Sequence, residues 1–181
     1  AWERVKAVDS PALGIVLDSF HILSLGDSLS RLHEVPVDKI TFLQLADAPL
    51  MKMDVLEWSR HFRCFPGQGE LPLVEFTREL TRVGYRGPWS LEIFNDGFRA
   101  SPNGATAKDG YRSLLWLEEQ TRNALGDTDA DLFQTANLPT YQGTEFIEFA
   151  ASPAEAKKLS AMLSGMGFTL AGVHRSKQVA L

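Results

Sequence analysis

The sequence of 181 residues has one cysteine, Cys64, and this excludes an internal disulfide. A lone thiol agrees with a reducing compartment, so we expect a cytoplasmic protein. No apolar run approaches the roughly 20 residues that a membrane-spanning helix needs, and no membrane partner is expected. Positive charge is not in excess, since the net charge is -5, which argues against a nucleic-acid partner.

The rest of the composition is typical of a globular protein, and one apolar run stands out. Residues 13–17 (LGIVL) end in Asp18, and His21 follows three positions later. A run of this length is too short for a typical helix. It predicts a strand buried on both faces, as in a parallel sheet.

Two later runs end in the same way. Residues 40–43 (ITFL) end at Gln44, and residues 87–91 (GPWSL) lead into Glu92. The carboxyl ends of parallel strands meet at one edge of a sheet, where α/β enzymes bind their ligands. Asp18, Gln44 and Glu92 are hard oxygen donors, so we expect a site for a divalent metal ion such as Mg, Mn or Co. The alternative is that each residue only caps its strand, but the recurrence on three units favours the metal.

Helices are predicted between and after these strands, at residues 27–34, 55–62, 72–83 and 108–125. This alternation predicts an α/β fold of parallel strands with right-handed crossovers. Three strands cannot close a barrel, so residues 1–125 are expected to be the C-terminal part, about three βα units, of a TIM barrel. The missing initiator Met and the strand-like end suggest a fragment. A fragment of this kind would expose apolar surface, be inactive alone and be able to form a homo-oligomer.

Residues 126–142 are acidic and lack periodicity, which is typical of a linker. A second pattern begins at residue 143, with an expected strand at 146–150 and further strands at 168–173 and 178–181. Ser152 and Glu155 form a capping-box pattern around Pro153 and predict the start of a helix. Residues 143–181 are therefore expected to begin a second, α+β domain.

Three more side chains are candidates for the site. His21 could transfer protons near the metal or be a structural histidine. Ser59 and Arg63 are four residues apart and share one face if their segment is helical. Arginine is suited to a bidentate grip on a carboxylate or phosphate, and the alternative is a surface arginine. Cys64 has no base partner in the sequence and is not proposed as a nucleophile.

These motifs carry a resemblance to a known family. The motif D-x-x-H after a strand, R-x-x-P-G-x-G at 63–69 and L-E-I-F at 91–94 resemble the sugar isomerase/epimerase superfamily of metal-dependent TIM barrels. The resemblance implies that Asp18, Gln44 and Glu92 are three of four metal ligands, on barrel strands six, seven and eight. The fourth, a Glu on strand five, would precede residue 1. Many relatives have His at the position of Gln44.

Residues from Thr144 on, including H-R-S-K-x-V, resemble the first module of a vicinal-oxygen-chelate (βαβββ) domain of the 4-hydroxyphenylpyruvate dioxygenase type. The metal-binding His of that superfamily would fall at Phe146, so a second metal is not expected. The combination resembles the bacterial two-domain 3-dehydroshikimate dehydratases of quinate/shikimate and aromatic compound catabolism. It implies a lyase that converts 3-dehydroshikimate to protocatechuate. In this chemistry His21 would transfer a proton, Arg63 would hold the substrate carboxylate and Ser59 would assist.

Three other interpretations remain at this point. A sugar or inositol isomerase or epimerase would use the same metal-dependent barrel without needing a residue that holds a substrate carboxylate. An abasic-site endonuclease would need more His and Glu ligands and a basic face, which the sequence lacks. A regulatory or oligomerising protein with a degenerate barrel is disfavoured by the intact set of Asp18, Gln44 and Glu92.

Overall fold

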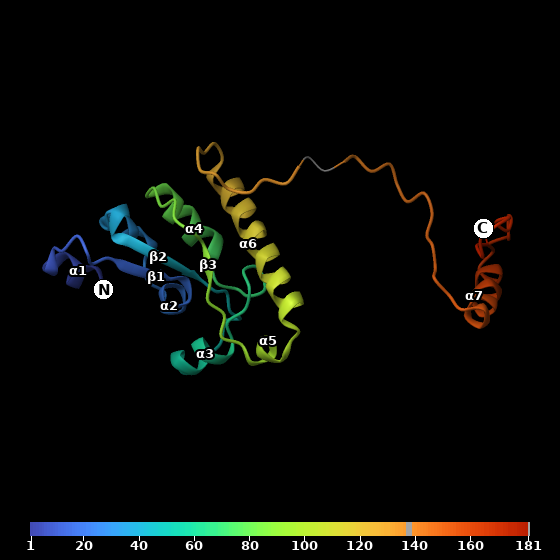
Figure 1. Ribbon diagram of the computed structural model, residues 1–181, viewed down its shortest axis with the longest axis horizontal. Helices are drawn as coiled ribbons and strands as arrows, with labels where there is room; N and C mark the ends of the chain where they lie inside the picture. Colours follow the sequence, from blue (N-terminus) through green and yellow to red (C-terminus); the bar gives the residue numbers. More distant parts are fainter. Residues whose placement is uncertain (137–138, 181) are drawn as a thin grey trace. The chain divides into compact units, whose positions relative to one another are not determined.

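The computed structural model describes residues 1–136 and 139–180. It divides into two units, residues 1–138 and residues 139–181, which are described separately. Figure 1 shows the helices and strands of each unit. Among the described residues, no helix is both long and apolar enough to cross a membrane.

The first unit is built on a three-stranded parallel sheet. Its strands are β1 (Ile15–Asp18), β2 (Ile40–Leu45) and β3 (Ser90–Leu91), in the order β1-β2-β3. The predicted parallel arrangement is therefore confirmed. Asp18 pairs with Gln44 across β1 and β2, and Gln44 pairs with Ser90 on β3. Because Glu92 follows two residues after Ser90, all three predicted metal ligands lie at the same edge of the sheet.

The helices of this unit are α1 (Trp2–Val8), α2 (Ser19–Ser24), α3 (Val55–His61), α4 (Leu73–Arg82), α5 (Asp96–Ala100) and α6 (Asn103–Leu125). The segment predicted as a helix at 27–34 forms a 3-10 helix instead, η1 (Leu29–Glu34), and a second one follows, η2 (Val37–Lys39). α4 agrees with the prediction, and α6 begins earlier because Pro102 provides its start. α4 and α6 pack side by side (Figure 1).

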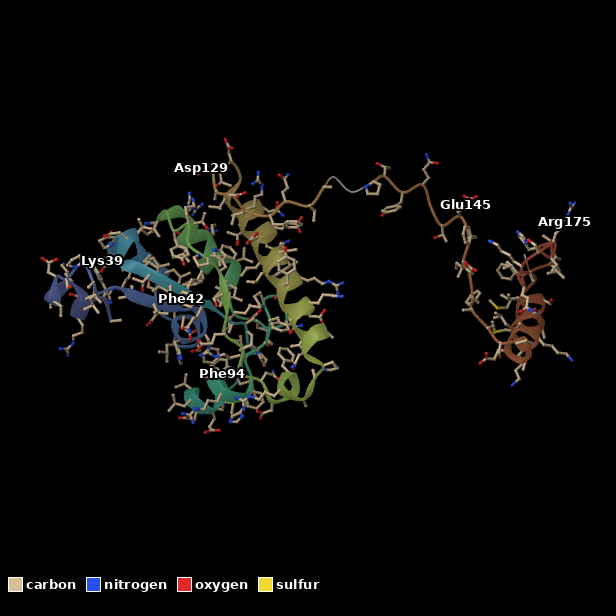
Figure 2. The ribbon with its side chains drawn as sticks, viewed as in Figure 1. Lys39, Phe42, Phe94, Asp129, Glu145 and Arg175 are labelled. Carbon is tan, nitrogen blue, oxygen red and sulfur yellow. The ribbon has the colours of Figure 1, made fainter. Side chains whose placement is uncertain are left out.

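The main core lies between one face of the sheet and helices α1, α4 and α6. The alternating residues Ile15 and Leu17 of β1 are buried there, and Phe76 of α4 is fully buried. On the opposite face Val16 is 52% exposed, and Phe42, labelled in Figure 2, is 38% exposed. The expectation that the first strand is buried on both faces is thus wrong for the described residues, because no element of this unit covers the second face. Asp18 and Gln44 continue that open face, following the alternation of side chains along each strand.

A buried carboxylate organises the loop between β2 and α4. Asp47 is 2% exposed, and its two oxygens accept backbone N–H groups from Ala48, Gly67, Gly69 and Leu71 at 2.8 to 3.1 Å. Four such hydrogen bonds compensate the loss of hydration of this group. The R-x-x-P-G-x-G loop is therefore folded around Asp47.

The second unit contains one helix, α7 (Pro153–Gly165), among its described residues. The predicted capping box of Ser152 and Glu155 is confirmed, with both reciprocal hydrogen bonds present. The strand expected at 146–150 is wrong, since these residues have no regular structure and are exposed. A strand needs a partner, and none of the described residues pairs with this segment. Val173 and Ala180 form a single antiparallel bridge, and the expected strand at 178–181 ends at a residue outside the described part.

The Asp47 loop makes a prediction about glycine. A Cβ at Gly69 would lie 2.4 Å from Asp47 Oδ1 and 2.5 Å from the backbone of Ala48, so Gly69→Ala should lower the free energy of unfolding by about 1–3 kcal/mol. The matched control is Gly104→Ala, because a Cβ at Gly104 in α6 meets nothing within 4 Å. This control should be neutral or slightly stabilising, since alanine favours helices. Chemical denaturation of both variants tests the prediction, and equal stabilities would contradict it.

Candidate active site

A cleft of about 650 Å³ opens at the C-terminal edge of the sheet, between the strand ends and helices α2, α3 and α5. Figure 2 labels Phe94, which lies beside α3 at this edge. The cleft is lined by Val16, Asp18, His21, Gln44, Leu56, Ser59, Arg60, His61, Arg63, Glu92, Phe94 and Arg99. All six site residues predicted from the sequence are therefore brought into one cleft.

Arg63 is the centre of this group, although only 2% of its side chain is exposed. Nη1 donates to Asp18 Oδ2 at 3.0 Å and to the Glu92 carbonyl at 3.3 Å. Nη2 donates to Ser59 Oγ at 2.8 Å and to His21 Nε2 at 3.2 Å, and Nε donates to Ser59. A guanidinium group has five N–H donors, so every donor of Arg63 has a protein partner.

The surroundings of Arg63 stabilise a buried positive charge. Its guanidinium carbon lies 4.8 Å from the centre of the Phe20 ring and 5.5 Å from that of Phe94. The Asp18 carboxylate compensates the charge directly, and Glu92 Oε2 lies 3.8 Å from Nη1. Removing one partner of such a buried pair would leave an uncompensated charge.

Asp18 has two structural roles that explain the D-x-x-H spacing. Oδ1 accepts the backbone N–H groups of Phe20 and His21 and so caps α2, while Oδ2 faces Arg63. His21 then lies on the first turn of α2, with its side chain 48% exposed. Arginine can only donate, so His21 Nε2 must accept from Arg63, and the proton of the neutral ring is on Nδ1.

Gln44 and Glu92 complete the predicted ligand set. The side chain of Gln44 has no hydrogen-bond partner within the described part of the chain, and 31% of the Glu92 side chain is exposed in the cleft. Two carboxylates and an unpaired amide at one edge fit a hard divalent cation. Among residues 1–136 and 139–180, no three His, Cys, Asp or Glu side chains form a metal-binding group. A group of these four residue types does not include Gln44, so its absence does not test the predicted set of Asp18, Gln44 and Glu92. The metal site therefore stays a prediction.

Two residues that support the site were not predicted from the sequence. Asp47 holds the loop that follows Arg63, and Asn95 donates from Nδ2 to the carbonyl of Arg63 at 2.9 Å. Asn95 also caps α5 through Gly97 and Phe98. The one sequence signal for Asn95 is the preference of asparagine for helix N-caps.

Comparison with known proteins agrees with this architecture. Residues 1–120 match the family described as xylose isomerase-like TIM barrel. The chain belongs to this family. The TIM-barrel part of the fold prediction is thereby confirmed for residues 1–120.

Three known proteins, one of them a solved structure, are similar in sequence to this chain. A 3-dehydroshikimate dehydratase of Pseudomonas putida is 53% identical over 185 residues, which cover 99% of this chain and 29% of the relative. A solved xylose isomerase-like TIM barrel/4-hydroxyphenylpyruvate dioxygenase fusion protein is also 53% identical, with a TM-score of 0.85 over 99% of this chain and 30% of that protein. An inosose isomerase of Halalkalibacterium halodurans is 33% identical over 60% of this chain and 39% of its own length. The resemblance found in the sequence is confirmed, although the chain spans less than a third of the first two of these proteins.

Cys64 follows Arg63 in the R-x-x-P-G-x-G loop and is buried next to Asp47. Burial, with a smaller contribution from the negative charge of Asp47, raises the pKa of its thiol from 9.0 to about 12. The reactive thiolate is therefore scarce at pH 8, and Cys64 should resist Ellman's reagent in the folded protein. Full reaction in guanidinium chloride is the positive control. Rapid labelling of the folded protein at pH 8 would contradict this environment.

Proposed function

We propose that this barrel segment belongs to a metal-dependent lyase that converts 3-dehydroshikimate to protocatechuate. The observation that carries the proposal is the single cleft that gathers Asp18, His21, Gln44, Arg63 and Glu92. The name of the Pseudomonas putida relative supports the same reaction. The substrate would be a small molecule with a carboxylate, a ketone and a hydroxyl group that can leave.

The residues of the chain divide the work of this reaction. Asp18, Gln44 and Glu92 would hold a divalent cation, which when bound supplies Lewis-acid stabilisation of negative charge on the ketone oxygen. Removal of the proton next to the ketone gives an enediolate, the β-hydroxyl leaves, and the net change is loss of one water. His21 would transfer protons. To accept the substrate proton, His21 Nε2 would have to leave Arg63, and the imidazolium so formed can then give a proton to the leaving hydroxyl group.

Arg63 and Ser59 are proposed to serve the site in two ways. Arg63 was expected to hold the substrate carboxylate, and this stays a proposal, because a substrate oxygen would have to replace one of its present acceptors. The weakest of these, by distance, is the Glu92 carbonyl at 3.3 Å. Arg63 also fixes the side chains of Asp18 and His21, and Ser59 fixes Arg63 through its hydroxyl.

A second candidate is a sugar or inositol isomerase, which the inosose isomerase relative favours. It would use the same cleft and the same proton removal next to a ketone. The two candidates differ in product, because an isomerase returns the proton to the neighbouring carbon and loses no water. Only the dehydratase produces an aromatic ring.

The remaining segments are assigned on the same basis. We propose residues 126–142 as a linker and residues 143–181 as the start of a vicinal-oxygen-chelate domain. The solved fusion protein, whose name includes a 4-hydroxyphenylpyruvate dioxygenase part, supports this assignment. Homo-oligomer formation is also proposed, because several large apolar side chains of the described residues are exposed.

The test is an assay of the 181 residues together with any native sequence that flanks them, because the 181 residues alone are expected to be inactive. Protocatechuate formation from 3-dehydroshikimate should be lost on treatment with a chelator and restored by Mg, Mn or Co. Glu92→Gln and Gln44→Ala should lower metal affinity, measured by calorimetry, by about 10- to 100-fold. Turnover of an inosose without protocatechuate formation would favour the isomerase instead.

Arg63→Lys separates the two proposed roles of Arg63. Lysine keeps the charge but cannot make five hydrogen bonds, so we expect kcat/KM to fall by a factor equivalent to about 1–3 kcal/mol. A fall in kcat with little change in KM indicates that Arg63 positions Asp18 and His21. A rise in KM with unchanged kcat indicates contact with the carboxylate. Wild-type kinetics would contradict both roles.

A further inference from the structure

The cleft contains two more arginines beyond the buried one. Arg60 of α3 and Arg99 of α5 both line it, and both are exposed. Within the described part of the chain, neither side chain forms an ion pair or a hydrogen bond. Arg60 and Arg99 therefore bring two positive charges to the cleft that are not paired with an acidic side chain among the described residues.

The two helices that carry these arginines are fixed to each other. His61 Nδ1 and Asp96 Oδ2 are 2.8 Å apart, and the backbones of Phe62 and Asn95 form an antiparallel bridge. Arg60 directly precedes His61, and Arg99 follows Asp96 by about one helical turn. Figure 1 shows α3 and α5 at the same end of the unit. Both arginines therefore line the same cleft from two helices that are attached to each other.

The other ionisable side chains around the cleft already have partners within the protein. Asp18 is paired with Arg63, and Glu92 lies close to the same guanidinium. Glu57 and Asp96 both contact His61, at 3.5 Å and 2.8 Å, and this histidine is positively charged only when it is protonated. An anionic group that enters the cleft therefore meets Arg60 and Arg99 as its free cationic partners, while Arg63 would have to give up a protein contact.

We infer that Arg60 and Arg99 bind the carboxylate of the substrate, and that this pair sets the preference for a carboxylate-bearing ring. The inference rests on the proposed function for the identity of the ring, and on the geometry of the cleft for the anion site. The planar fork of each guanidinium matches a carboxylate, and a charge-assisted hydrogen bond is stronger than a neutral one. Arg63 then remains inside the site as a positioning residue.

Binding of two product-like ligands tests the anion site without turnover. Protocatechuate and catechol have the same pair of neighbouring hydroxyl groups, so contacts to a metal cancel in the comparison, and they differ only by the carboxylate. In calorimetry with the metal-loaded protein and its native flanking sequence, we expect a preference for protocatechuate of about tenfold or more. The double variant Arg60→Gln with Arg99→Gln should lose this preference and bind catechol as the wild type does. Arg4→Gln, an exposed arginine on α1, is the matched control and should keep the preference.

Kinetics separate failure of this inference from failure of the proposed function. With 3-dehydroshikimate, the double variant should raise KM at least tenfold and change kcat little, because the carboxylate is bound equally before and during reaction. If the wild type produces protocatechuate and the double variant keeps both its KM and its preference, the anion site is overturned while the dehydratase stands. If the wild type shows no turnover but the preference depends on both arginines, the anion site stands and the dehydratase falls.

Discussion

The buried guanidinium of Arg63 is the constraint on which the site depends. A charged group that is shut off from solvent is tolerated only when its donors are satisfied and its charge is paired. Asp18, His21, Ser59 and the Glu92 carbonyl satisfy those donors, and they come from β1, α2, α3 and the segment after β3. The side chain therefore fixes several strand and helix ends relative to one another, at the edge where the predicted metal ligands lie.

The loop that carries Arg63 is held by a second buried residue, Asp47. The backbones of Asp47 and Cys64 exchange two hydrogen bonds, at 2.8 and 3.0 Å, directly beside Arg63. The Asp47 carboxylate then holds the rest of the loop through Gly67 and Gly69. A residue with a Cβ at Gly69 would meet the carboxylate, so glycine is required there by close approach. The R-x-x-P-G-x-G motif thus positions Arg63, and its two glycines donate backbone hydrogen bonds to the carboxylate of Asp47.

A feature could be predicted from the sequence where it depends on residues that lie close together in the chain. The strand ends at Asp18 and Gln44 and the capping box at Ser152 depend on residues close in the chain, and the structure has them. The role of Asp47 depends on N–H groups about 20 residues away, which no local pattern shows. The strand predicted at 146–150 is wrong although its local pattern is suited to a strand, because a strand also needs a partner to pair with. The six site residues were found from the sequence, whereas the network that makes Arg63 a buried positioning group was not.

If Arg60 and Arg99 bind the substrate carboxylate as we infer, the division between a buried arginine and two exposed ones separates catalysis from substrate choice. Asp18, His21 and Arg63 line the cleft and are joined by hydrogen bonds, so a change at any of them disturbs the others. Arg60 and Arg99 have no such ties among the described residues, so they can be replaced without loosening the catalytic group. Relatives of this chain include proteins named 3-dehydroshikimate dehydratase and inosose isomerase, and of the two reactions proposed above only the dehydration needs a site for a substrate carboxylate. If the anion site lies on α3 and α5, the dehydration and the isomerisation can share Asp18, His21 and Arg63 and differ at Arg60 and Arg99. Such a difference is expected in a barrel whose loops at the C-terminal edge of the sheet set specificity.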